Sequence, residues 1–328
     1  METERIPRPY GQKLRQWTQL MHAAGLDADT DMDSVVMLWE GQQLVAAGSR
    51  KGNLLKCIAV DPAHQGEGLL AAVLTALRQD AFLSGYNHLF LYTKPENQQL
   101  FSSLFFYPVV RTDRVLLMED KQGGIQNFLR ECSPQKGGDK IGAIVMNCDP
   151  FTLGHQHLIH TAAAQCDWLY VFVLSEDKGR FSAEDRMAMV RAGTAELQNV
   201  MVLPTGPYLI SSATFPTYFL RDRDLAVQAH CQLDIEVFLK HFMPCFGITD
   251  RYVGTEPLSA LTRQYNEALA SQLPKRGIAF HEIPRLERRD APISASAVRK
   301  LLDEGRTEEA RALLPASTFD YLKDRHLI

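Results

Sequence analysis

The stretch N-C-D-P-F-T-L-G-H, residues 147–155, decides the fold of the second half of this chain. It lies between an apolar run at 141–146 and a helical pattern from Gln156 on, so it predicts a strand, a tight turn and a helix start. Free backbone N–H groups at a helix start attract phosphate. Gly154 would let a nucleotide approach the backbone, and His155 would direct a donor at a phosphate oxygen. An ordinary strand-to-helix turn explains the same residues, and both interpretations stay open here.

Regular alternation of strands and helices follows this stretch. Apolar runs recur, with helical segments between most of them, at residues 141–146, 168–174, 200–203, 252–253 and 278–283. This order predicts an α/β fold, a Rossmann-like doubly wound and mostly parallel sheet. Ligands of such sheets bind at the carboxyl ends of the strands, which is where the opening stretch lies.

The first half of the chain has a different pattern. Short strands predominate, at residues 35–39, 44–47, 54–60, 89–92 and 109–118. Helical patterns near 69–82 and 98–105 interrupt them, and the mixture predicts an α+β domain. A segment rich in Pro, Gly and polar residues then separates the halves. We therefore expect one domain at 1–131, a linker at 132–140 and a second domain at 141–328.

Composition and charge narrow the function classes. The 328 residues carry a net charge of −4, which argues against nucleic acid or an anionic membrane as a partner. The six cysteines are scattered without a C-x-x-C pair, as is typical of free thiols in a reducing compartment rather than of a zinc site. No signal-peptide core and no membrane-length apolar run is present. We expect a cytoplasmic protein with no metal site of its own.

A second helix start near the C-terminus repeats the pattern of the first. Residues 292–299, P-I-S-A-S-A-V-R, follow the last apolar run. Ser294 is suited to cap the new helix, and Ser296 and Arg299, three residues apart, share one face. Two hydroxyls, free N–H groups and a guanidinium would form a second anion site. A capped helix with a surface arginine is the alternative.

Together, T-x-G-H at 152–155 and I-S-x-S-x-x-R at 293–299 resemble the paired signature of the nucleotidylyltransferase superfamily. Thr152 departs from the commoner H-x-G-H. The resemblance implies that the two helix starts clamp the triphosphate of ATP. It also implies that Thr152 and His155 contact phosphate oxygens, while Ser294, Ser296 and Arg299 hold the β- and γ-phosphates.

The resemblance extends to one family. Segments 147–155, 175–186, 210–216, 253–257 and 282–285 are similar to the citrate (pro-3S)-lyase ligase family, as is the first half of the chain. Asp149 stands where Asn is expected in that family, which places a carboxylate near the phosphate site.

The family resemblance implies activation of acetate by ATP. Acetyl-adenylate and pyrophosphate form, and the acetyl group then passes to the thiol of the CoA-like prosthetic group on the acyl carrier subunit of citrate lyase. Acetate is ionised at neutral pH, so positioning and charge stabilisation suffice without a general base. Mg²⁺ bridging the phosphates is expected. An adenylyltransferase acting on a pantetheine phosphate, or a CoA-dependent acetyltransferase, are the alternatives.

Three basic residues lie in the segment 175–186, which follows the apolar run at 168–174. Lys178 is a catalytic candidate and Arg180 a nucleotide-binding candidate, because both lie at the edge where ligand is expected; otherwise they are solvated loop charges. Arg186 follows a capping-box pattern at 182–185, and we expect it to lie on the surface of that helix.

Further nucleotide-binding candidates end two other strands. Asn147 ends the strand before the T-x-G-H turn. Gly254 and Glu256 follow the run at 252–253, and the family resemblance implies that they belong to the nucleoside pocket. A purely structural role for these two residues is the alternative.

The loop V-D-P-A-H-Q-G-E-G-L-L, residues 60–70, resembles the loop of GNAT N-acetyltransferases that cradles the CoA pyrophosphate on backbone amides. Leu70 replaces the usual small residue, and Phe106 stands where Gly often precedes Phe. No acid or base for acetyl transfer is identifiable. Our hypothesis is that this domain recognises the CoA-like arm or its carrier protein; a structural remnant is the alternative.

Overall fold

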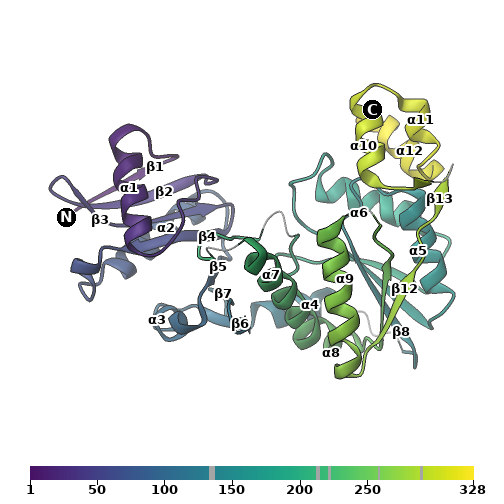
Figure 1. Cartoon of the computed structure of the whole chain (residues 1–328), viewed down its shortest axis with the longest axis horizontal. Coiled ribbons are helices and arrows are strands. Elements are labelled where there is room, and N and C mark those ends of the chain that lie inside the picture. The colour runs from purple at the N-terminus through teal and green to yellow at the C-terminus, as the bar shows by residue number, and fades with distance from the viewer. Residues whose placement is uncertain (133–136, 212–214, 221–222, 258, 289–290) are drawn as a thin grey trace. The chain divides into compact units, whose positions relative to one another are not determined.

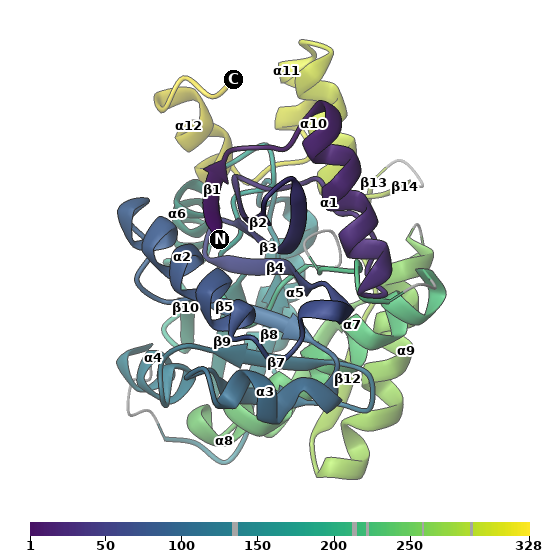
Figure 2. The same cartoon turned by 90° about the vertical axis from the view of Figure 1, so that its left-hand side faces the viewer.

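The computed structural model describes residues 1–132, 137–211, 215–220, 223–257, 259–288 and 291–328. The chain forms two compact units (Figures 1 and 2). Unit 1 comprises Met1–Ile125 and Phe215–Glu236, and unit 2 comprises Gln126–Thr214 and Val237–Ile328. The expected domain boundaries stay a prediction, and residues 133–136 of the expected linker lie outside the described residues. In addition, the segment Phe215–Glu236 packs with the N-terminal residues of unit 1, although it lies within the second domain expected from the sequence.

Unit 1 is the predicted α+β unit and contains a seven-stranded sheet in the order β1-β2-β3-β4-β5-β7-β6. All neighbouring strands are antiparallel except β4 and β5. The strands are β1 Glu2–Ile6, β2 Ser34–Glu40, β3 Gln43–Lys51, β4 Leu54–Val60, β5 Phe90–Thr93, β6 Tyr107–Arg111 and β7 Leu116–Glu119. Its helices are α1 Gly11–Ala23, α2 Leu69–Leu83, α3 Gln98–Ser102 and all but the last residue of α7 Arg223–Val237.

The prediction of a single strand at 109–118 is wrong, because two strands, β6 and β7, lie there. The chain turns between β6 and β7, where the Thr112 hydroxyl accepts hydrogen bonds from the backbone N–H groups of Arg114 and Val115. Such a side-chain-to-backbone bond favours a turn over a continuous strand.

Helix α2 covers one face of the sheet with an apolar stripe, and Val73, Leu74 and Leu77 are fully buried.

Unit 2 contains a five-stranded parallel sheet in the order β10-β9-β8-β11-β12, which confirms the predicted fold. The strands are β8 Ile141–Met146, β9 Trp168–Val173, β10 Val200–Pro204, β11 Asp250–Gly254 and β12 Ala279–Ile283. The helices are α5 Leu153–Ala163, α6 Ala183–Ala192, α8 Met243–Phe246, α9 Ala260–Gln272, α10 Ala295–Asp303, α11 Thr307–Arg311 and α12 Ala316–Asp324, together with α4 Gly124–Cys132, whose first two residues belong to unit 1. The chain order reverses between β8 and β11, so a ligand crevice is expected beyond their carboxyl ends.

Arg186 corrects the sequence expectation, because it is fully buried rather than on the surface of α6. Its guanidinium donates to the carbonyl oxygens of Phe181, Leu174 and Glu176, and to both oxygens of Asn147. One side chain thus fixes the residues that end β8 and the loop that follows β9. The capping pattern predicted the helix start at Ala183, but the inward direction of Arg186 depends on carbonyl groups distant in sequence.

Replacing Arg186 with Met should lower the free energy of unfolding by roughly 3–5 kcal/mol, because several buried carbonyl groups lose a charged donor. Urea unfolding measures the change. Arg191→Met on the same helix is the control; its side chain is exposed, so a change within about 0.5 kcal/mol is expected. Equal losses in the two variants would contradict the anchoring role of Arg186.

Candidate nucleotide-binding site

The T-x-G-H turn forms the helix start that its sequence predicts. Thr152 is the N-cap of α5, and its hydroxyl accepts a hydrogen bond from the His155 backbone N–H at 3.4 Å. The Thr152 backbone N–H donates in return to Nδ1 of His155 at 3.0 Å. Since Nδ1 accepts this bond, the neutral ring carries its proton on Nε2. The turn therefore selects the tautomer of the histidine as well as capping the helix.

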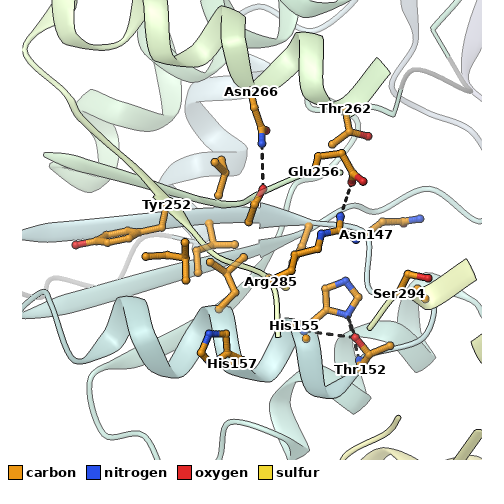
Figure 3. Close-up of a pocket in the computed structure, with 18 of the residues that line it drawn as sticks. Asn147, Thr152, His155, His157, Tyr252, Glu256, Thr262, Asn266, Arg285 and Ser294 are labelled. Carbon is orange, nitrogen blue, oxygen red and sulfur yellow. Dashed lines mark hydrogen bonds and ion pairs between the residues drawn. The ribbon is translucent and has the colours of Figure 1, made fainter. Parts of the chain in front are cut away.

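The surroundings of His155 keep its ring neutral. Burial, and secondarily the nearby Arg285 guanidinium, lower the pKa of His155 to about 4. Figure 3 shows the ring facing Arg285, and the ring also stacks on Phe151 with centroids 6.0 Å apart. At neutral pH the side chain therefore offers an uncharged N–H donor.

The second motif also forms a helix start. Ser294 caps α10 by accepting a hydrogen bond from the Ala297 backbone N–H at 3.2 Å. Arg299 donates to the Ser296 hydroxyl at 3.2 Å, so the two residues share a face as predicted. The two motifs meet: a Cβ added to Gly154 would lie 3.1 Å from the carbonyl oxygen of Ile293. A side chain at residue 154 would crowd this carbonyl oxygen, so Gly154 favours the close approach of one helix start to the other.

The two helix starts border a cavity of about 650 Å³, drawn in Figure 3. Its volume is within the range of small-molecule sites. Eight residues singled out in the sequence line it: Asn147, Thr152, Gly154, His155, Gly254, Glu256, Ser294 and Ser296. Lys178, Arg180 and Arg299 do not belong to its walls. Lys178 and Arg180 lie on the exposed loop after β9, where Arg180 pairs with Asp303.

The carboxylate of Asp149 is held by backbone and side-chain groups of the protein itself. Its carboxylate is buried and accepts hydrogen bonds from the backbone N–H groups of Arg180 at 3.1 Å and Phe181 at 2.9 Å. Arg299 lies 3.4 Å from the same carboxylate and also donates to the Asp149 carbonyl oxygen. The space beside it is tight, since a Cβ on Gly179 would lie 2.6 Å from the Asp149 carboxyl carbon. Asp149 thus joins the first motif, the loop after β9 and the second motif.

Arg285 is a wall residue that the sequence reasoning did not single out. Its Nε donates to the carbonyl oxygen of Thr255 at 2.6 Å, and its guanidinium pairs with Glu256. Glu256 also accepts a hydrogen bond from the Ser259 backbone N–H at 3.0 Å. The E-I-P-R segment at 282–285 was the available signal, but it did not reveal that Glu256 orients this arginine.

Asn266 is a second wall residue missed in the sequence. It donates from α9 to the Gly254 carbonyl oxygen at 3.0 Å, so it fixes the end of β11 (Figure 3). Its helical position gave no signal of this role.

No helix in the described part of the chain is both long and apolar enough to cross a membrane.

Two solved structures share little sequence with the chain. An acetyltransferase of the GNAT family from Desulfovibrio desulfuricans is 15% identical with a TM-score of 0.31, and the match covers 36% of this chain and 98% of that one. Thermotoga maritima TmcAL, bound with alpha-thio ATP, is 18% identical with a TM-score of 0.33 over 56% of this chain and 55% of that one.

Sequence comparisons give a closer match. A family model described as the citrate lyase ligase C-terminal domain matches residues 141–322. The citrate (pro-3S)-lyase ligase of Klebsiella pneumoniae is 42% identical over 307 residues, which cover 92% of this chain and 89% of that protein. Because both the family model and this nearly full-length relative agree, the chain belongs to the citrate (pro-3S)-lyase ligase family.

Proposed function

We propose that this chain activates acetate with ATP as acetyl-adenylate and then acetylates the thiol of the CoA-like prosthetic group on the acyl carrier subunit of citrate lyase. The observation that carries the proposal is the meeting of two helix starts at one cavity, beside the neutral His155 ring. Helix starts favour phosphate, and the family name supports a ligase that acts on citrate lyase. The family name also favours this function over plain adenylyl transfer.

In the first step, an oxygen of acetate attacks the α-phosphorus while the bond from phosphorus to the pyrophosphate oxygen breaks. Acetate needs no general base because it is ionised at neutral pH. Negative charge grows on the phosphate oxygens, and preoriented donors stabilise it. We assign that role to the Nε2–H of His155, the backbone N–H of Gly154 in α5 and the first backbone N–H groups of α10, those of Ala295 and Ser296. The other N–H groups at the start of α5 are already bonded, Leu153 to the Leu313 carbonyl oxygen and His155 to the Thr152 hydroxyl. Thr152 orients His155 through the cap, and Ser294, Ser296 and Arg299 complete the phosphate side.

The remaining candidate residues have supporting roles in the proposal. Asn147, Gly154 and Gly254 line the path of the nucleotide, and Glu256 acts through Arg285. Lys178 and Arg180 would reach the phosphates from the exposed loop after β9.

Mg²⁺ is expected with the ATP phosphates, where it would offset their charge. Among the described residues no group of three His, Cys, Asp or Glu side chains could hold a metal, so phosphate oxygens and water would supply most of its ligands.

In the second step the prosthetic thiol, as its thiolate, attacks the acetyl carbonyl carbon, and AMP leaves with the electrons of the C–O bond.

The direct test is incubation of the chain with ATP, Mg²⁺, acetate and deacetylated citrate lyase. AMP, pyrophosphate and acetylated carrier should appear in equal amounts and depend on every component. Formation of an adenylylated small molecule without acetylated carrier would instead support the adenylyltransferase alternative.

His155→Ala should slow acetyl-adenylate formation about a hundredfold or more, because a donor to the transition state is lost. Acetate-dependent exchange of pyrophosphate into ATP measures this step alone. His160→Ala is the matched control on α5, since His160 is half-exposed and pairs with Glu196. Near-normal exchange in the His155 variant would remove this residue from the mechanism.

The depressed pKa of His155 gives a pH dependence of definite sign. The unfolded chain takes up a proton near pH 6.5, whereas the folded chain does so only near pH 4. The free energy of unfolding should therefore fall as the pH drops from about 6.5 toward 4, by at most about 1.4 kcal/mol per pH unit from this residue. Urea unfolding across this range should show a weaker pH dependence in His155→Gln, and identical curves for the two proteins would contradict a neutral His155 ring in the folded chain.

A further inference from the structure

One arginine in the wall of the unit 2 cavity lies within reach of a ligand. Within the described residues the wall contains two arginines, Arg251 and Arg285. Arg251 is only 2% exposed, and its guanidinium lies over the Phe238 ring and donates to the Ala143 carbonyl oxygen. The Arg285 side chain keeps 26% of its surface exposed, so a ligand in the cavity can contact its guanidinium.

The protein fixes this guanidinium while leaving one of its nitrogens to a ligand. The Arg285 backbone N–H donates to the Thr255 hydroxyl at 3.1 Å, and Nε–H donates to the Thr255 carbonyl oxygen at 2.6 Å. Nη2 donates to Glu256, whose carboxylate also accepts from the Ser259 backbone N–H. In the part of the chain that the structure describes, no group accepts a hydrogen bond from Nη1. Two donor hydrogens are therefore held in place without an acceptor.

The Nε2–H of His155 is a second donor of the same kind. The Thr152 cap occupies Nδ1, and no described side chain or backbone group accepts from Nε2. Figure 3 shows the Arg285 guanidinium between the Glu256 carboxylate and this ring. It is close enough to lower the pKa of His155, an effect second to that of burial. Two adjacent donors without a protein acceptor form a place for a ligand oxygen that carries negative charge.

The position of Arg285 along the cavity indicates which oxygen this is. Its Cγ would lie 4.0 Å from a Cβ added to Gly254, at the end of β11 where the nucleoside is expected. Its guanidinium faces His155 at the start of α5, where the phosphates are expected. The α-phosphate is the group that joins the nucleoside to the pyrophosphate. A guanidinium between these two parts of the wall therefore suits the α-phosphate better than the β- or γ-phosphate.

We propose that Arg285 is a catalytic residue, which binds a non-bridging oxygen of the α-phosphate together with His155 in both steps of the reaction. When acetate attacks phosphorus, negative charge grows on this oxygen while the bond to pyrophosphate breaks. In the second step the thiolate forms the thioester bond, the acyl C–O bond breaks, and its electron pair stays on the phosphate. The α-phosphate thereby gains one negative charge as AMP leaves, and the guanidinium offsets it. The role in two steps rests on the proposed function, whereas a contact between Arg285 and an α-phosphate does not.

Binding of adenosine, AMP and ATP to the full chain, without acetate, tests this contact. Ligand-observed NMR titration measures the three dissociation constants. The preference for AMP over adenosine reports contacts with the α-phosphate, and the preference for ATP over AMP reports contacts with the β- and γ-phosphates. Arg285→Met should reduce the first preference about tenfold or more, because a charged hydrogen bond is lost. The affinity for adenosine and the second preference should each change less than threefold.

Two further variants control for charge and folding. Arg263→Met removes the same charge from α9; Arg263 is exposed and lies outside the described wall of the cavity, so all three affinities should change less than threefold. Arg285→Met deprives the Glu256 carboxylate of this cation, which can lower the stability of the fold. The double variant Glu256→Gln, Arg285→Met removes both charges, and its preference for AMP should also fall about tenfold. Thermal unfolding checks that each variant is folded.

Several results would overturn the proposal. The unmodified chain could show no preference for AMP over adenosine, or Arg285→Met could leave that preference unchanged. A loss confined to the preference for ATP over AMP would assign Arg285 to the β- and γ-phosphates. Equal weakening of all three ligands in the folded double variant would reduce Arg285 to a structural support.

The catalytic role has its own measurement. Arg285→Met should slow acetate-dependent exchange of pyrophosphate into ATP about a hundredfold at saturating ATP, and near-normal exchange would contradict this role. Absence of exchange in the unmodified chain would instead contradict the proposed function, and with it the role in two steps. The binding preferences are measured without acetate, so they decide the α-phosphate contact in either case.

Discussion

The buried carboxylate of Asp149 joins the three segments that unit 2 brings to one edge of its sheet. It accepts hydrogen bonds from backbone N–H groups of the loop after β9 and lies beside Arg299 of α10. A buried charge is stable only when such partners satisfy it, so the segments must keep their positions together. Arg186 performs the reciprocal task with a buried cation and the carbonyl groups at the ends of β8 and β9. The arrangement of the proposed nucleotide site depends on these two charges.

The electrostatics of the site follow from burial as much as from formal charge. His155 is neutral because burial opposes its protonation and Arg285 reinforces the effect. A neutral donor fixed by a helix cap needs no reorientation when charge develops on a phosphate. Glu256, an acidic residue in the wall, is neutralised by Arg285 and therefore does not repel an anionic ligand.

The sequence predicted the main elements around the site. Alternating apolar runs and helical patterns indicated all five strands of unit 2, and Thr152 and Ser294 marked the starts of α5 and α10. These predictions succeeded because strand periodicity and helix capping are local properties. The turn at Thr112 was missed because a hydroxyl bond to the backbone interrupts an apolar pattern that otherwise continues.

The sequence by itself determined the parallel sheet of unit 2, both helix starts and the residue types that suit phosphate. Only the tertiary structure decided that Gly154 meets Ile293, that Asp149 and Arg186 are buried connectors, and that the Tyr218 hydroxyl bonds to the Tyr92 carbonyl oxygen of β5. The reason is physical: a local pattern specifies how a segment folds, whereas the partner of a buried polar group depends on which distant backbone groups the packed chain leaves unpaired.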